Sequence, residues 1–391
     1  MSEAAPSSVL EGIPIVRRLQ SVRGYNVGVL CALVLSLASS TLIILRYGSP
    51  TTGEPRDLFS DHLRHVLETW TFLFRGFGVY RGTFGTTALT NYPHFDVPSV
   101  GVPWPLMPVT YPMGTFAFFL PPTLVGAYVP MTRSAFTKVI VLYVVVMTHL
   151  AILGVARCLR GASAGRTVVL VAVWFFMLKM CLHGFYDGVW LGLGAMSIAK
   201  LADQRYGASL QWFAAAAFTS LKAVSLAPVG ACALFLLMRS GARVWTKLAL
   251  AAPAALVCLH VLWTVVVTFR YVPKPGTSTY EVAKSILLPI GTAGEVVIAA
   301  GIIAALLVAL NSNWLVAISI ALATAVTIHH AGHAWHAAVL VPSALLPGAL
   351  PSDRRIGLTR EIVALWMLGV SQIAYLTPLY AIVEYMIQRV E

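Results

Sequence analysis

The stretch "YNVGVLCALVLSLASSTLIIL", Tyr25 to Leu45, decides the fold class of this chain. It is apolar and free of charge over about 20 residues, the length that a helix needs to cross the hydrocarbon core of a bilayer. Arg17, Arg18 and Arg23 precede it, as in a signal peptide, but the apolar core of a signal peptide is shorter. We therefore predict an uncleaved first span whose N-terminus lies in the cytoplasm.

The same composition extends along the whole chain. Of its 391 residues, 58% are hydrophobic and only 11% are charged, which excludes the soluble globular classes. Backbone groups in lipid must be hydrogen-bonded internally, and the apolar runs lack the strict alternation of barrel strands. The predicted fold is an all-α polytopic transmembrane helical bundle, with residues 1–391 forming a single transmembrane domain.

The basic residues indicate the topology. The net charge is +12, but Lys and Arg occur in small groups between apolar runs and form no nucleic-acid motif, so no nucleic acid partner is predicted. Short cytoplasmic loops are enriched in such residues. Placing these groups inside gives about 11 spans, if run 113–130 does not cross fully and run 210–238 crosses twice around Lys222. Besides the N-terminus, the groups are Arg157 to Arg166, Lys200 to Arg205, Arg239 to Lys247 and Arg354 to Arg360.

This topology places the polar features of the chain on the non-cytoplasmic side of a bacterial inner membrane or endoplasmic reticulum. Residues 47–112 become a long first outer loop that carries interfacial helices. The turn that contains Asp187, the turn at Lys222 and the histidines 329–336 lie on the same side. Candidate chemistry is therefore expected there, in contact with membrane lipids.

An amphipathic helix is predicted within the first outer loop. Asp61, Arg64, His65 and Glu68 follow helical spacing and share one face, while apolar residues line the other. An acidic residue just after the first span can act as a general base on a hydroxyl, with Arg64 or His65 tuning its pKa. A merely solvated polar face explains the same periodicity equally well.

Three further features are candidates for a binding site. The stretch "YPMGTFAFFLPP", residues 111–122, either shapes the bundle or walls a lipid-facing groove. Asp187 lies at a membrane boundary, where a carboxylate is costly unless it is paired or faces a cavity; the alternative is a turn residue at the water edge. Lys222 is the one charge in a long apolar run, so it either reaches the interface or meets an anion such as a lipid phosphate.

Four histidines lie close together in "TIHHAGHAWHAAVL", residues 327–340. On a helix His329, His333 and His336 share one face, and imidazoles bind zinc, copper or iron. No Asp, Glu or Cys lies between His329 and Asp353, which weakens the case for a metal site. A phosphate or sugar contact is favoured, and a purely structural membrane edge remains an alternative.

Taken in order along the chain, these motifs resemble the GT-C superfamily of integral-membrane glycosyltransferases, and most closely its polyprenyl-phosphate-mannose-dependent mannosyltransferases. The matching pieces are "SDHLRH", "RGFGVY", "TYPMG", "SLKAVSLAP" and "HAWHAAVLVPSALLP". There is no Asp-x-Asp in the first loop, and "TYPMG" lacks the second proline of the bacterial pattern.

The resemblance implies a function and a set of residues. It implies transfer of a hexose, mannose before others, from a polyprenyl-phosphate sugar to an acceptor on the non-cytoplasmic side. Asp61 would be the catalytic base, and Lys222 would bind the donor phosphate. His333 and His336 would contact the donor phosphate or sugar, and Arg64, His65 and Asp187 complete the predicted substrate site. No metal ligand is assigned, and dependence on a divalent metal stays open.

Two other functions remain as alternatives. A non-catalytic GT-C-like structural subunit of a membrane-protein complex would show the same departures from the family motifs. A membrane metalloenzyme built on the histidines would show about one transition metal per chain.

Overall fold

The computed structural model describes residues 22–47, 60–80, 92–93, 111–159, 164–182, 186–270, 341–342 and 345–346. Within these ranges the chain is 90% helical and has no strand, so the all-α class is confirmed for them. The elements are α2 (Val22–Tyr47), α3 (Ser60–Arg75), η2 (Gly76–Tyr80), α5 (Met113–Tyr128), α6 (Arg133–Cys158), α7 (Ala164–Leu182), α8 (Asp187–Ala202), α9 (Tyr206–Thr219), η5 (Leu221–Leu226), α10 (Ala227–Arg239) and α11 (Val244–Arg270).

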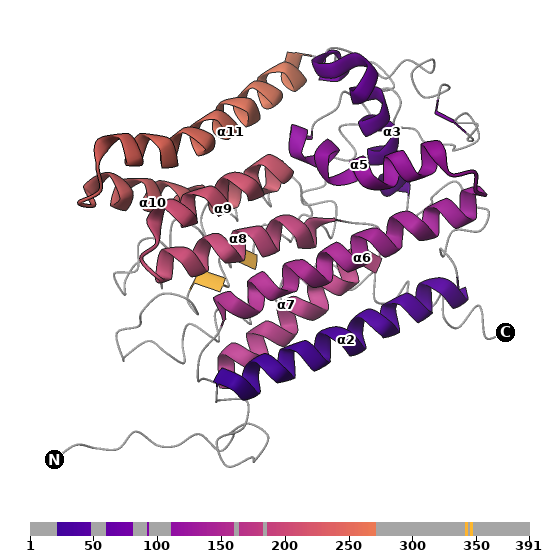
Figure 1. The fold of residues 1–391 in the computed structure, drawn as a ribbon, viewed down its shortest axis with the longest axis horizontal. Coiled ribbons are helices and arrows are strands. Elements are labelled where there is room, and N and C mark those ends of the chain that lie inside the picture. Colours follow the sequence, from indigo (N-terminus) through magenta and orange to yellow (C-terminus); the bar gives the residue numbers. More distant parts are fainter. Residues whose placement is uncertain are drawn as a thin grey trace, which may run out of the picture.

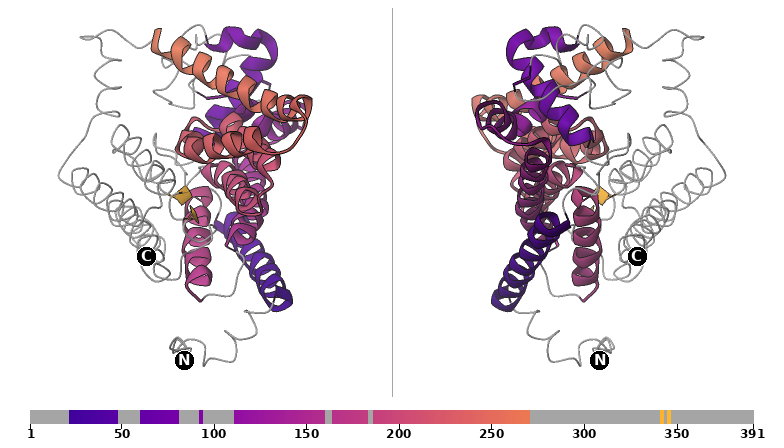
Figure 2. Two further views of the ribbon diagram at one scale, coloured as in Figure 1. Left: turned by 90° about the vertical axis from the view of Figure 1, so that its left-hand side faces the viewer. Right: turned by 90° about the vertical axis from the view of Figure 1, so that its right-hand side faces the viewer.

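The helices form a stack in which α2 and α11 are the two edges (Figure 1). Between them α6, α8 and α9 pack one against the next, α7 covers α6 and α8, and α10 lies against α9. The side views in Figure 2 show the same order from α11 down to α2. Helices α3 and α5 pack on each other across one end of the stack, where α5 also contacts α6 and α9.

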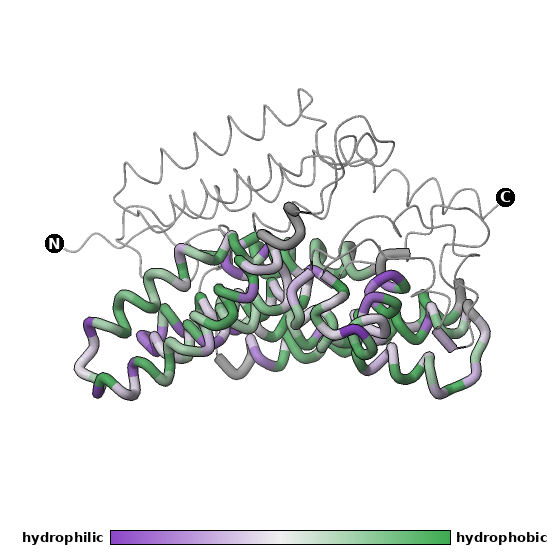
Figure 3. Tube along the Cα trace, turned by 90° about the horizontal axis from the view of Figure 1, so that it is seen from above, coloured by the Kyte–Doolittle hydropathy of each residue, from purple (hydrophilic) through white to green (hydrophobic). Residues whose placement is uncertain are grey.

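Four helices among the described residues are long and apolar enough to cross a membrane. They include the stretches Tyr25–Leu45, Ser134–Cys158, Leu221–Arg239 and Val244–Thr264. Figure 3 shows the matching distribution, with hydrophobic residues along most of the helical trace. A multi-pass membrane protein is therefore supported and its first span lies where the sequence predicted it, while the count of 11 spans is not confirmed.

Close backbone approach holds the centre of the stack together. A Cβ atom placed on Gly192 of α8 would lie 2.5 Å from both the Cβ and the carbonyl oxygen of Ala151 in α6. A Cβ on Gly154 would likewise meet the carbonyl oxygen of Gly192. Small residues at these positions let α6 and α8 approach more closely than larger side chains would allow.

The chain breaks at Lys222, as the sequence predicted. Helix α9 ends at Thr219, Ser220 is extended, and the 3₁₀ helix η5 leads into α10. Gly230 of α10 lies against Phe213 of α9, so the two helices run antiparallel and form a hairpin. The hydroxyl of Ser220 accepts a hydrogen bond from the Lys222 amide and caps η5.

Helix α5 passes through Pro121 and Pro122 without a break. Its 16 residues span about 24 Å at 1.5 Å per residue, less than the ~30 Å hydrocarbon core. Helix α8 has the same length, so whether run 113–130 crosses fully stays a prediction.

Candidate functional site

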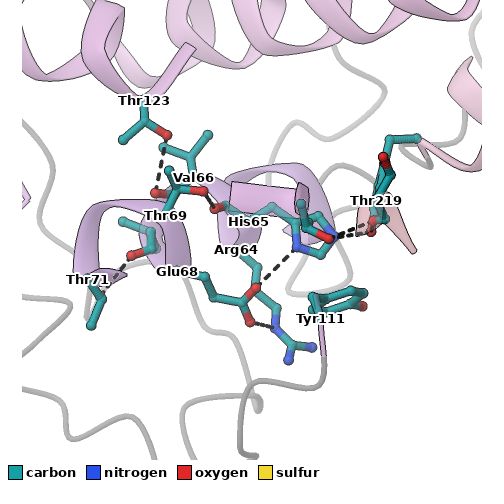
Figure 4. Close-up of polar contacts among 12 residues, drawn as sticks. Arg64, His65, Val66, Glu68, Thr69, Thr71, Tyr111, Thr123 and Thr219 are labelled. Atoms are coloured by element: carbon teal, nitrogen blue, oxygen red, sulfur yellow. Dashed lines mark hydrogen bonds and ion pairs between the residues drawn. The ribbon is translucent and has the colours of Figure 1, made fainter. Parts of the chain in front are cut away.

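Three polar side chains of α3, those of Arg64, His65 and Glu68, form one largely buried group (Figure 4). Arg64 Nε donates to Glu68 Oε1 at 2.7 Å, and His65 Nδ1 lies 3.2 Å from Glu68 Oε2. Glu68 is only 1% exposed. Burial alone would raise the pKa of Glu68, but the Arg64 guanidinium and the His65 ring hold it below its ordinary value. Glu68 therefore remains a carboxylate at neutral pH.

Aromatic rings surround His65. Its ring centroid lies 4.4 Å from that of Tyr111, 4.9 Å from Phe119 and 5.2 Å from Tyr186. The Arg64 guanidinium stands 5.6 Å from the centre of the Tyr111 ring. The polar face of α3 is thus covered by α5 and by the residue before α8. The interpretation of this face as merely solvated is wrong for His65 and Glu68.

Hydroxyl groups connect α5, the residue before α8 and the hairpin. The Tyr186 hydroxyl lies 3.1 Å from Thr115 Oγ1 and donates to the Thr219 carbonyl at 3.3 Å. Thr115 Oγ1 donates to the same carbonyl at 2.8 Å. These bonds satisfy the carbonyl at the end of α9, which the helix itself leaves without a partner.

Asp187 and Lys222, both predicted as separate candidates, form an ion pair with each other. Lys222 Nζ donates to Asp187 Oδ1 at 2.9 Å and to Oδ2 at 2.8 Å, and Trp190 Nε1 donates to Oδ1 at 2.7 Å. The side chain of Lys222 is 21% exposed and that of Asp187 is 5% exposed. In this structure the anion that meets Lys222 is therefore the Asp187 carboxylate.

We call the residues Arg64, His65, Glu68, Tyr186, Asp187 and Lys222 the polar cluster. Tyr186 joins its two halves, because it contacts His65 through its ring and precedes Asp187 in the chain. Two cations and two carboxylates thus lie within one apolar surrounding at one end of the bundle. Such a set can bind an anion and can take up a proton.

Four of the seven predicted site residues meet in this cluster: Arg64, His65, Asp187 and Lys222. Asp61 lies in the first turn of α3, three residues before Arg64, but its side chain lies outside the described residues. His333 and His336 also lie outside the described ranges, so their predicted contacts are not tested.

Tyr186, Thr115 and Thr219 were not predicted as site residues. Uncharged hydroxyls inside apolar runs carry no pattern that separates them from ordinary packing. The one available indication was the position of Tyr186 directly before a membrane-boundary carboxylate.

Among the described residues there is no group of three His, Cys, Asp or Glu side chains that could hold a metal ion. Burial, together with the neighbouring His65, lowers the pKa of His62 to about 3, so the His62 ring is neutral at physiological pH.

Comparison with known proteins gives no relative for this chain: no model of a protein family matches it, and no curated protein matches its sequence.

Proposed function

We propose that this protein is a membrane glycosyltransferase that moves a hexose, mannose before others, from a polyprenyl phosphate to an acceptor hydroxyl on the non-cytoplasmic side. One observation supports it above the others. Segments far apart in the chain, α3, the start of α8 and the hairpin at η5, bring two buried carboxylates and two partly buried cations into one cluster.

The chemistry fits these groups. A bond forms between the acceptor oxygen and the anomeric carbon, the bond from that carbon to the phosphate oxygen breaks, and the hydroxyl proton passes to a base. The leaving group is a lipid phosphate, whose growing negative charge is stabilised by nearby cations. Arg64 and Lys222 are the cations of the polar cluster, and Asp61 is the proposed base. His333 and His336 are proposed as further contacts to the donor.

Asp61 precedes Arg64 by three residues on α3, a spacing that places the two positions on one face of the helix. The proposed base and a proposed phosphate-binding cation are therefore carried by the same rigid element. His65 fixes that element by its ring contacts with Phe119 of α5 and with Tyr186.

The test uses purified protein and a radiolabelled polyprenyl-phosphate mannose. The Asp61→Asn variant is expected to lose transfer by about 10²- to 10⁴-fold, the usual range for a missing general base. Asp203→Asn serves as a matched control, since Asp203 forms an exposed ion pair with Arg157. Equal transfer by wild type and Asp61→Asn would remove Asp61 from the mechanism.

One observation favours a second candidate, a non-catalytic structural subunit. The charges of the polar cluster are paired internally, Arg64 with Glu68 and Lys222 with Asp187. The same assay separates the two, because a structural subunit would transfer no sugar from any polyprenyl-phosphate donor, alone or with its partner proteins.

A further inference from the structure

Helix α11 reaches the start of α5 through a histidine in the middle of an otherwise apolar helix. The amide of Met113 donates a hydrogen bond of 3.0 Å to Nε2 of His260. Met113 is the first residue of α5, and the residue before it, Pro112, makes no side-chain cap. His260 therefore satisfies a helix N-terminal amide that α5 itself cannot satisfy. In accepting this bond Nε2 carries no proton, so the ring proton is on Nδ1.

An aromatic group holds this histidine in place. The His260 ring lies 6.0 Å from Trp263, 6.3 Å from Tyr80, 6.4 Å from Phe77 and 6.1 Å from Phe218, measured between centroids. These rings come from α11, η2 and α9. Several helices thus fix the position of a side chain that belongs to a peripheral helix.

The same aromatic group also contacts Tyr111, the residue whose ring lies against His65 and Arg64 of the polar cluster. The Tyr80 hydroxyl donates a hydrogen bond of 2.8 Å to the Tyr111 carbonyl. Tyr111 lies two residues before Met113, whose amide donates to His260. The Tyr111 ring in turn lies against His65 and beneath the Arg64 guanidinium. Two hydrogen bonds that anchor the short segment 111–113 therefore come from Tyr80 and His260, whose rings contact each other.

We propose that His260 is a positioning residue of the polar cluster. By accepting the Met113 amide it fixes the entry into α5, and through Tyr111 it sets the place of Arg64 and His65 on α3. Its influence on sugar transfer rests on the proposed function, whereas the coupling from α11 to α3 is measured without any activity.

The first measurement is hydrogen exchange of the protein in detergent, followed in peptides that cover residues 111–118 and 62–70. His260→Phe keeps an aromatic ring but removes the acceptor, and it is expected to speed exchange at the start of α5 about fivefold, the effect of one lost hydrogen bond. Exchange around Arg64 and Glu68 is expected to rise as well. His260→Gln, which restores a neutral acceptor, is expected to return both segments toward the wild-type rate.

The matched control removes another hydrogen bond of the same helix. Gln211 of α9 donates to the Leu250 carbonyl in α11 at 2.9 Å, away from segment 111–113. Gln211→Leu is expected to leave exchange at 111–118 and at 62–70 unchanged. Unchanged exchange in His260→Phe, or an equal rise in Gln211→Leu, would overturn the proposal whether or not the protein transfers sugar.

The second measurement is transfer from polyprenyl-phosphate mannose. His260→Phe is expected to raise KM for the donor more than it lowers kcat, because the residue acts through groups that bind the donor, and His260→Gln is expected to restore KM. Faster exchange without any change in KM would overturn the positioning role while the proposed function stands. No transfer by the wild-type protein would instead reject the proposed function, and the exchange data would still decide the coupling.

Discussion

The helices at the centre and at the edges of the stack have similarly apolar sequences but differ in how much of each helix is buried within the described part of the chain. In α6, 56% of the apolar stretch is buried, against 17% in α2 and 6% in α11. Lipid is as apolar as the side chains themselves, so hydrophobicity does not select which helix goes to the centre. At the centre, α6 and α8 meet at Gly154 and Gly192, where a Cβ atom would collide with the opposite backbone. Close contact between small residues therefore holds α6 against α8.

The largest expected effect tests the close contact at the centre. Gly192→Ala places a Cβ within 2.5 Å of Ala151, partly against backbone, so α6 and α8 have to separate. We expect a loss of about 3 kcal/mol in the free energy of unfolding, measured by thermal unfolding in detergent. Gly241→Ala is the matched control, because a Cβ there meets nothing within 4 Å. Equal stability of both variants would refute the role assigned to close approach.

A smaller effect is expected at the polar end of the stack. Lys222→Met removes the two hydrogen bonds that Lys222 donates to the buried Asp187 carboxylate and leaves the bond from Trp190. We expect this to cost about 2 kcal/mol, below the range for fully buried pairs because Lys222 is partly exposed. The double variant Lys222→Met, Asp187→Asn removes both charges and is expected to recover part of this loss in the same unfolding measurement. If the double variant is less stable than Lys222→Met alone, the ion pair is not what links α8 to the hairpin.

The smallest effect concerns the edge. Ser36 of α2 lies 2.9 Å from His149 Nε2 in α6, while His149 Nδ1 donates to the Val145 carbonyl at 2.7 Å. Ser36→Ala is expected to cost about 0.6 kcal/mol, the average for such bonds between membrane helices. Ser39→Ala, on the exposed side of α2, is the control. Identical unfolding of both variants would show that α2 is held by packing alone.

The sequence predicted the elements of the site better than their contacts. Helical spacing placed Arg64, His65 and Glu68 on one face of a helix, because that period is local. It could not show that Tyr111, Phe119 and Tyr186 cover this face, since these rings come from distant segments.

The pairing of Asp187 with Lys222 could not be predicted from the sequence either. Each was recognised alone, as a charge too costly to leave in an apolar run. Their separation of 35 residues follows no periodicity, and only the hairpin brings them together. His260 was missed for a related reason, because a single histidine in an apolar helix gives no indication of a partner 147 residues away.

The shortness of α9 has an electrical consequence. Its 14 residues reach about 21 Å, so in the proposed topology, with Arg205 at one boundary of a ~30 Å hydrocarbon layer, Ser220 would lie about 9 Å below the other. Every residue of α9 is at least partly buried within the bundle. An anionic head group drawn down to Lys222 would cross about a third of the membrane potential. That corresponds to roughly 0.7 kcal/mol per charge at 100 mV, and it couples binding at this site to the energised state of the membrane.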